Sequence, residues 1–131
     1  MRQETQFSVF LINKPGVLAN VTGSLAEAGV NILALSLSDS GEHGVLRILT
    51  DDVDKTRSVL NSEHDRWTET DVIVTKLEDH PGAFAAKANQ LSEGGVNVLY
   101  AYCTGGFDTG VTYAVFKVVD TERARGVLGD E

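Results

Sequence analysis

One pattern of twenty residues occurs twice in this sequence. Residues 13–32 read NKPGVLANVTGSLAEAGVNI, and residues 79–98 read DHPGAFAAKANQLSEGGVNV. The two stretches align without a gap, so that each Pro-Gly pair and each Val-Asn pair coincide. The repeat predicts two similar units, which we place at residues 1–70 and 71–131. A unit of this size buries little apolar surface alone. We therefore expect the two units to be stabilised by their fusion in one chain or by dimerisation.

Both copies carry the same predicted order of elements. Residues 6–13 and 71–78 are rich in β-branched and aromatic side chains and predict strands. Apolar residues then recur at helical spacing, and glycine follows each run. Residues 31–38 alternate leucine with Ala or Ser, which predicts a half-buried second strand. A hairpin, a third strand and a second helix follow, and Asp52 and Asp120 are expected to cap the second helices.

This order predicts an α+β fold of two tandem ferredoxin-like βαββαβ units. Each has an antiparallel sheet in the order 4-1-3-2 with both helices on one face. Residues 66–70 are expected to form the fourth strand of the first copy, whereas the equivalent of that strand in the second copy falls beyond Glu131. The second unit is therefore predicted to lack its last strand. Its first strand would then be a bare edge, which we expect the other unit or a second chain to cover.

Composition excludes several classes of function. The formal net charge of −8 argues against a nucleic-acid partner and against an anionic membrane surface. No apolar run is long enough to span a membrane, and the start of the chain has no signal-peptide character, so we expect a cytoplasmic protein. The lone Cys103 fits a reducing compartment. His43, His64 and His80 have no metal-ligand spacing, so neither a metal site nor a cofactor is expected.

The repeated Pro-Gly turn suggests a site for a small zwitterion. Proline suits the first residue of a helix, and the glycine after it allows a ligand to approach closely. The free N–H groups of the first helical turn then favour a carboxylate. Asn13 and Asp79, just before the turns, can accept from an ammonium group or simply cap the helix. The turn thus suits an α-amino acid, and a purely structural turn remains the alternative.

Both copies resemble the D-x-P-G-x-L…G-x-N-I pattern of ACT domains, small regulatory modules that bind amino acids. The resemblance extends over nearly the whole chain, as two ACT repeats. It implies a ligand at an interface between ACT units, where one unit supplies the turn and its neighbour supplies the start of strand two. Carried onto this sequence, the implied ligand-binding residues are Asn13, Pro15, Gly16, Val17, Leu18, Asn31 and Ile32, and Asp79, His80, Pro81, Gly82, Ala83, Phe84, Asn97 and Val98.

The two implied sites depart from the pattern in different ways. Asn13 stands where the family usually has Asp, so the second copy has the better partner for an ammonium group. Phe84 is larger than Leu18 and is expected to narrow the second site.

The resemblance implies a non-catalytic sensor of a free amino acid that forms a homodimer. The alternative is a regulatory subunit of an amino-acid biosynthetic enzyme, similar to the small subunit of acetolactate synthase. Acylphosphatases share the fold but need an Arg where this chain has Lys14 or His80, so no enzyme is predicted. Tyr100, Tyr102 and Tyr113 suit an RNA-recognition module, but the acidic balance disfavours it. These tyrosines are expected to cover the open sheet face at a dimer contact.

Overall fold

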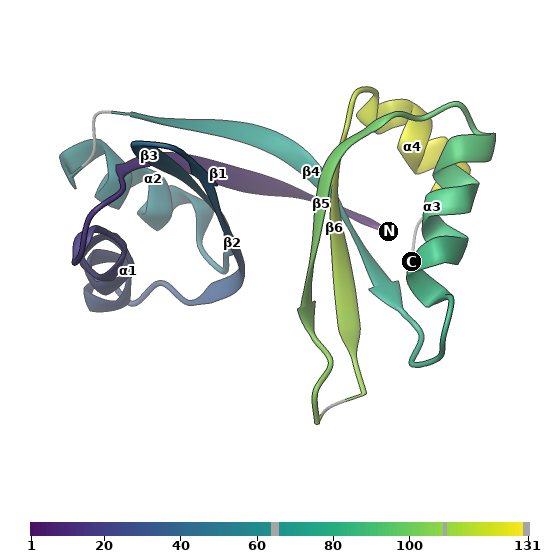
Figure 1. The fold of residues 1–131 in the computed structure, drawn as a ribbon, viewed down its shortest axis with the longest axis horizontal. Coiled ribbons are helices and arrows are strands. Elements are labelled where there is room, and N and C mark those ends of the chain that lie inside the picture. The colour runs from purple at the N-terminus through teal and green to yellow at the C-terminus, as the bar shows by residue number, and fades with distance from the viewer. Residues whose placement is uncertain (64–65, 109, 130–131) are drawn as a thin grey trace. The chain divides into compact units, whose positions relative to one another are not determined.

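The computed structural model describes residues 1–63, 66–108 and 110–129 (Figure 1). Within these residues, strands and helices alternate as two copies of β-α-β-β-α, and the predicted α+β fold is confirmed. The elements are β1 (Arg2–Ile12), α1 (Val17–Glu27), β2 (Ile32–Ser40), β3 (His43–Thr50), α2 (Val53–Glu63), β4 (Trp67–Leu77), α3 (Ala83–Glu93), β5 (Val98–Gly105), β6 (Thr112–Val118) and α4 (Thr121–Leu128).

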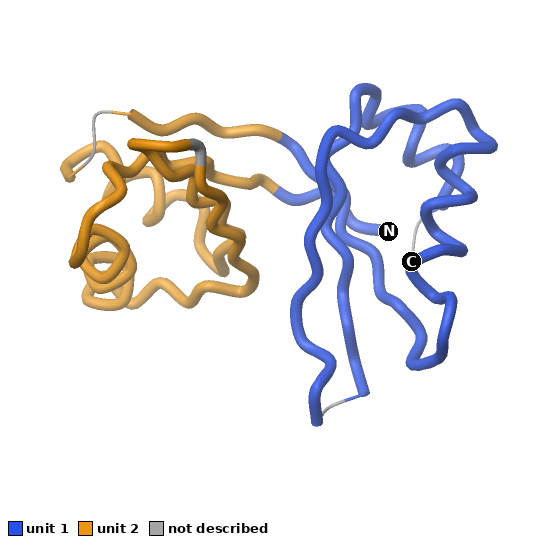
Figure 2. The backbone as a smooth tube through the Cα atoms, in the orientation of Figure 1, with its two compact units in different colours: residues 1–4, 71–131 blue, residues 5–70 orange. Residues whose placement is uncertain are grey.

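The chain divides into two compact units (Figure 2). The N-terminal unit comprises residues 5–70, drawn in orange. The C-terminal unit comprises residues 71–131 together with residues 1–4, drawn in blue. The first four residues thus group with the second copy of the repeat and not with the first.

In the N-terminal unit the strand order is β2-β3-β1-β4, the 4-1-3-2 order that the sequence predicts. β1 and β3 are antiparallel, and their register places Phe7 opposite Ile48 and Val9 opposite Leu46. All four side chains are fully buried. They pack with Val21, Leu25 and Leu60 from the two helices, and Trp67 at the start of β4 contacts Phe7 with ring centroids 5.9 Å apart.

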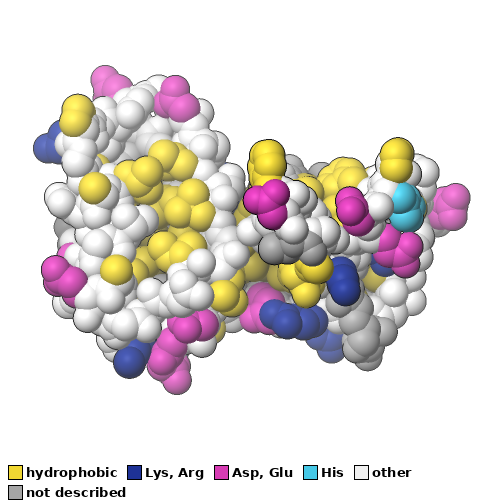
Figure 3. All heavy atoms as spheres, turned by 90° about the horizontal axis from the view of Figure 1, so that it is seen from below, with side chains coloured by type: hydrophobic (Ala, Val, Ile, Leu, Met, Phe, Trp, Pro, Cys, Tyr) yellow, Lys and Arg dark blue, Asp and Glu magenta, His cyan; other side chains and the backbone are white. Residues whose placement is uncertain are grey.

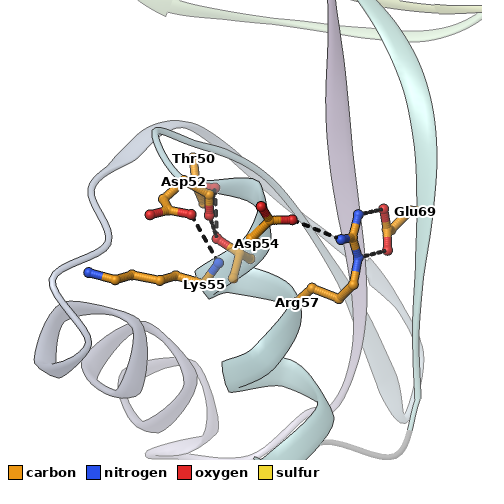
Figure 4. A network of polar contacts seen from close by, with 7 residues as sticks. Thr50, Asp52, Asp54, Lys55, Arg57 and Glu69 are labelled. Atoms are coloured by element: carbon orange, nitrogen blue, oxygen red, sulfur yellow. Dashed lines mark hydrogen bonds and ion pairs between the residues drawn. The ribbon is translucent and has the colours of Figure 1, made fainter.

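A polar network joins α2 to β4 in this unit (Figure 4). Arg57 donates from Nε and Nη2 to the two carboxylate oxygens of Glu69, at 2.7 and 2.9 Å, and from Nη1 to Asp54 at 3.1 Å. The hydrogen bond from Arg57 lowers the pKa of Glu69. At the start of α2, Asp52 accepts from the backbone N–H of Lys55 at 3.0 Å, so the predicted cap is confirmed.

The C-terminal unit reaches the same topology with a strand borrowed from the start of the chain. β4 is flanked by β6 on one side and β1 on the other, and β5 follows β6. Met1 is only 4% exposed and belongs to the core of this unit, together with Ile73, Leu91 and Phe116. The predicted bare edge of β4 is therefore covered by the first residues of the same chain.

One predicted break between strands is wrong. Residues 66–70 and 71–78 are expected as two strands, but β4 runs without interruption from Trp67 to Leu77. The segment WTETDVIVTKL contains neither Gly nor Pro, so nothing in it breaks an extended backbone.

The second predicted helix cap is confirmed at the start of α4. Asp120 accepts from the N–H of Arg123 at 3.0 Å.

The leucines of β2 are less buried than their alternation predicts. Leu33, Leu35 and Leu37 are 47%, 41% and 48% exposed, whereas Ala34 is buried. The register pairs Leu35 with Ile48 and Leu37 with Leu46, so these two leucines lie on the helix-bearing face of the sheet, whereas Leu33 lies at a shift in the register. β2 is the outer strand of its unit, and the helices leave that margin of the face uncovered.

A close approach of α3 and α4 predicts that Gly94→Ala destabilises the protein. A Cβ on Gly94 would clash with Val127 of α4, and the Gly94 carbonyl accepts from Arg123 Nε at 2.6 Å, so the backbone has little room to move. We expect the free energy of unfolding to fall by about 1–3 kcal/mol, as overpacking costs.

Urea unfolding measures this, with Gly126→Ala in the exposed face of α4 as the matched control. A Cβ at Gly126 would meet nothing within 4 Å. That variant is expected to gain about 0.5–1 kcal/mol from helix propensity. A Gly94→Ala protein as stable as Gly126→Ala would contradict the packing described.

Candidate functional site

Both Pro-Gly pairs form a type II turn that precedes the helix. In the N-terminal unit, the Val17 N–H points to the Lys14 carbonyl at 3.4 Å, with Pro15 and Gly16 as the central residues. Gly16 has φ 90° and ψ −17°, a left-handed conformation that requires glycine at the third position of such a turn. α1 then begins at Val17, so the prediction that proline opens the helix is wrong.

The C-terminal unit repeats this geometry. The Ala83 N–H donates to the His80 carbonyl at 3.3 Å, and Gly82 has φ 88° and ψ 0°. Gly16 and Gly82 N-cap their helices, and neither helix has a side-chain cap. Neither Asn13 nor Asp79 therefore acts as a cap.

Asn13 instead fastens its turn to the β2–β3 hairpin. Its side-chain Nδ2 donates to the Gly41 carbonyl at 3.3 Å, and its backbone N–H donates to the Glu42 carbonyl at 2.9 Å. The N–H groups of Leu18 and Ala19, at the start of α1, have no acceptor among the described residues. The start of α1 thus keeps hydrogen-bond donors available beside the hairpin.

A groove of about 200 Å³, which we call the N-terminal groove, lies between this turn and the hairpin. It brings together three residues of the predicted site, Asn13, Val17 and Leu18. The residues that line it are Leu11, Ile12, Asn13, Lys14, Val17, Leu18, Leu37, Ser38, Asp39 and Gly44. Asn31 and Ile32 do not line it, and the Asn31 N–H donates to Asp51 Oδ1 at 2.9 Å.

The second turn borders a larger and more polar groove, the C-terminal groove, of about 410 Å³. It brings together all six residues predicted around this turn. Its lining consists of Leu77, Glu78, Asp79, His80, Pro81, Gly82, Ala83, Phe84 and Thr112. Phe84 stacks on Phe116 with ring centroids 5.3 Å apart. Asn97 and Val98 do not line this groove, and the Asn97 carbonyl accepts from Val119 at 3.0 Å.

The sequence did not indicate the hairpin side of the grooves. Leu37, Asp39 and Gly44 in the first, and Thr112 in the second, come from strands that follow the repeated pattern. Gly44, a glycine inside a strand, is the one signal that could have pointed to them. Such a glycine often marks a place where a ligand or another backbone approaches closely.

His80 places both ring nitrogens against acceptors. Nδ1 lies 2.9 Å from the Pro81 carbonyl, and Nε2 lies 3.3 Å from Glu78 Oε2. Both contacts are made as hydrogen bonds only when both nitrogens carry a proton. The bond to Pro81, and then the bond and charge of Glu78 and the charge of Asp79, raise the pKa of His80 above its ordinary value.

This arrangement predicts a pH-dependent contribution to stability. Because the pKa of His80 is higher in the folded state, the stabilisation is complete below the unfolded value of about 6.5 and is lost as pH rises through the folded value. The melting-temperature difference between the wild type and His80→Gln should therefore shrink between acid and alkaline pH.

An NMR titration of the His80 ring provides the direct measurement. Glu78→Gln should lower the pKa of His80, whereas Glu93→Gln, at the far end of α3, should leave it unchanged. A His80 pKa that does not respond to Glu78→Gln would contradict the ion pair.

Comparison with known proteins places both units in one family. The model of the ACT domain pair matches residues 3–130. The crystal structure of protein BT0572 from Bacteroides thetaiotaomicron is similar to this chain at 32% identity and a TM-score of 0.88, over 96% of this chain and 86% of that one. No curated protein matches this chain.

More distant structures share the fold. The regulatory subunit of aspartate kinase from Thermus thermophilus, in a ligand-free form, aligns at 16% identity and a TM-score of 0.71, over 95% of this chain and 88% of that one. The corresponding subunit from Thermus flavus aligns at 18% identity and a TM-score of 0.65, over 96% and 88%. Because the family model spans both repeats, the chain belongs to the family of ACT domain pairs, whose domains are regulatory.

Proposed function

We propose that this protein is a non-catalytic sensor that binds a free α-amino acid in its two grooves. The observation that carries the proposal is that each groove combines hydrogen-bond donors with a carboxylate. N–H groups without acceptors among the described residues open each helix, and the carboxylate of Asp39 or Asp79 lies in the same groove. The donors suit the ligand carboxylate, and the acidic side chains suit its ammonium group. A cytoplasmic location is part of this proposal.

A second copy of the chain is the proposed partner at β2. Of the described strands, only β3 pairs with β2, so one edge of β2 is open. Leu33, Leu35 and Leu37 are between 41% and 48% exposed beside that edge. A group of hydrophobic side chains is visible on the face of the N-terminal unit turned to the viewer in Figure 3. A long apolar edge strand favours pairing with another chain. Such a partner would bring Asn31 and Ile32 to a site as the resemblance implies.

β5 of the C-terminal unit is an outer strand of the same kind, with Leu99 56% exposed. This second open edge favours the alternative candidate, in which the chain is the regulatory subunit of an amino-acid biosynthetic enzyme and binds that enzyme here. A pull-down from native lysate distinguishes the two, because the regulatory subunit brings a stoichiometric enzyme with it.

Amino-acid binding predicts a rise in the melting temperature. A ligand that binds only the folded state at a hundred times its dissociation constant stabilises by about 2.7 kcal/mol. For a chain of this size, we expect a shift of several degrees. A thermal-shift screen of the twenty amino acids at millimolar concentration makes the measurement. No shift with any of them would contradict amino-acid sensing.

Dimerisation through β2 predicts that Leu35→Lys produces a monomer with an unchanged fold. A lysine at this position would place a charge inside the surface that pairs with the second copy. Burying that charge without a partner is costly. Sedimentation equilibrium at micromolar concentration measures the mass. Phe107→Lys is the matched control, because Phe107 is fully exposed on the β5–β6 hairpin. A wild-type monomer, or a dimer that survives Leu35→Lys, would contradict this interface.

A further inference from the structure

The N-terminal groove has an apolar wall on the side of the sheet and α1. Leu11 is 5% exposed and forms part of the core, while Val17, Leu18 and Leu37 border the opening. A groove of about 200 Å³ is smaller than the roughly 300–1,000 Å³ of pockets for drug-sized ligands. Its size therefore suits a single amino acid.

Leu37, one wall of this groove, packs closely over Gly44. Gly44 lies in β3, directly opposite Leu11, and it is buried. Its backbone is not in the left-handed region, so glycine is not needed there for conformation. A Cβ at this position would lie 3.3 Å from Leu37 Cδ1 and 3.4 Å from the Ser38 carbonyl oxygen. A larger residue at position 44 would therefore push Leu37 away from β3 and change this wall of the groove.

The C-terminal unit has a larger residue at the equivalent position. Thr112 lies opposite Leu77 in the register, as Gly44 lies opposite Leu11. Glu78, Asp79 and His80 also line that groove, so its surroundings are charged. The two grooves therefore present different chemistry to the side chain of a ligand.

The rim of the N-terminal groove carries one charge of each sign. Lys14 lies on the turn, and Asp39 lies at the hairpin end of β2. The Oδ1 atom of Asp39 accepts from the Gly41 N–H at 3.0 Å, which orients the carboxylate. Asn13 is neutral and its amide is bonded to the hairpin, so Asp39 supplies the negative charge that Asn13 lacks.

We propose that the N-terminal groove selects an α-amino acid with an aliphatic side chain, which lies against Leu11 and Leu37. Asp39 binds the ammonium group, and Lys14 with the first N–H groups of α1 binds the carboxylate. This inference rests on the proposed function and adds to it the class of ligand and the role of Asp39.

Titration of the ¹⁵N-labelled full chain, followed by NMR, tests the inference. L-Leucine should shift the amide resonances of residues 37–44 and the start of α1. L-Aspartate should not, because its carboxylate would enter an apolar groove. 4-Methylpentanoate lacks the ammonium group, and it should bind at least tenfold more weakly than leucine.

Two variants with matched controls complete the experiment. Gly44→Thr installs the residue of the C-terminal unit and should abolish leucine binding, while Gly126→Ala, on the exposed face of α4, should leave it unchanged. Asp39→Asn should weaken leucine binding at least tenfold, while Glu27→Gln, on the exposed end of α1, should not. Should Gly44→Thr fail to fold, Asp39→Asn and the ligand series still decide the outcome.

The outcomes separate this inference from the proposed function. Leucine shifts that are confined to residues 78–84, or that survive Asp39→Asn, would overturn the inference and leave amino-acid sensing intact. Preferential binding of a charged amino acid in the N-terminal groove would do the same. No response to any of the twenty amino acids would overturn both.

Discussion

The C-terminal unit of this protein completes its sheet with the first residues of the chain, which come from the other repeat. β1 and β4 are both eleven residues long, and each is divided between the two units. Residues 67–70 serve the N-terminal unit as a fourth strand and continue as the first strand of the C-terminal unit. Residues 1–4, at the start of β1, belong to the C-terminal unit and lie beside its first strand. Without residues 1–4 the C-terminal unit would have one strand fewer and a bare edge at β4.

The elements were predictable because their signals are local. Each of these signals involves only residues that are close together in the sequence. Examples are the apolar spacing within α1 and within α3, and the cap that Asp52 or Asp120 forms on the helix that follows it. The backbone of the Pro-Gly turns was not predictable in the same way, because Pro-Gly suits both a helix start and a type II turn. The left-handed φ of Gly16 and Gly82 decides between them. The continuity of β4 was missed because a repeat boundary was expected where the backbone has no break.

The grooves depend on contacts that sequence proximity does not reveal. Leu11 and Gly44 are brought together only by the register of β1 and β3. Likewise, Asp39 approaches the first turn because the hairpin that carries it is bonded to Asn13. The repeated pattern therefore located one wall of each groove, the turn and the helix start. The opposite wall differs between the copies, with Gly44 in one and Thr112 in the other, and repetition gave no guide to it.

The burial of Met1 has a consequence for how such a tandem protein can be dissected. Chain termini usually tolerate trimming and fusion because few contacts hold them. Here the side chain of Met1 packs beside Leu91 and Phe116, and Arg125 donates to Gln3 at 2.6 Å. Residues 71–131 excised at the repeat boundary would lack this strand, and so the boundary visible in the sequence is not one at which the folded protein can be cut into independent halves.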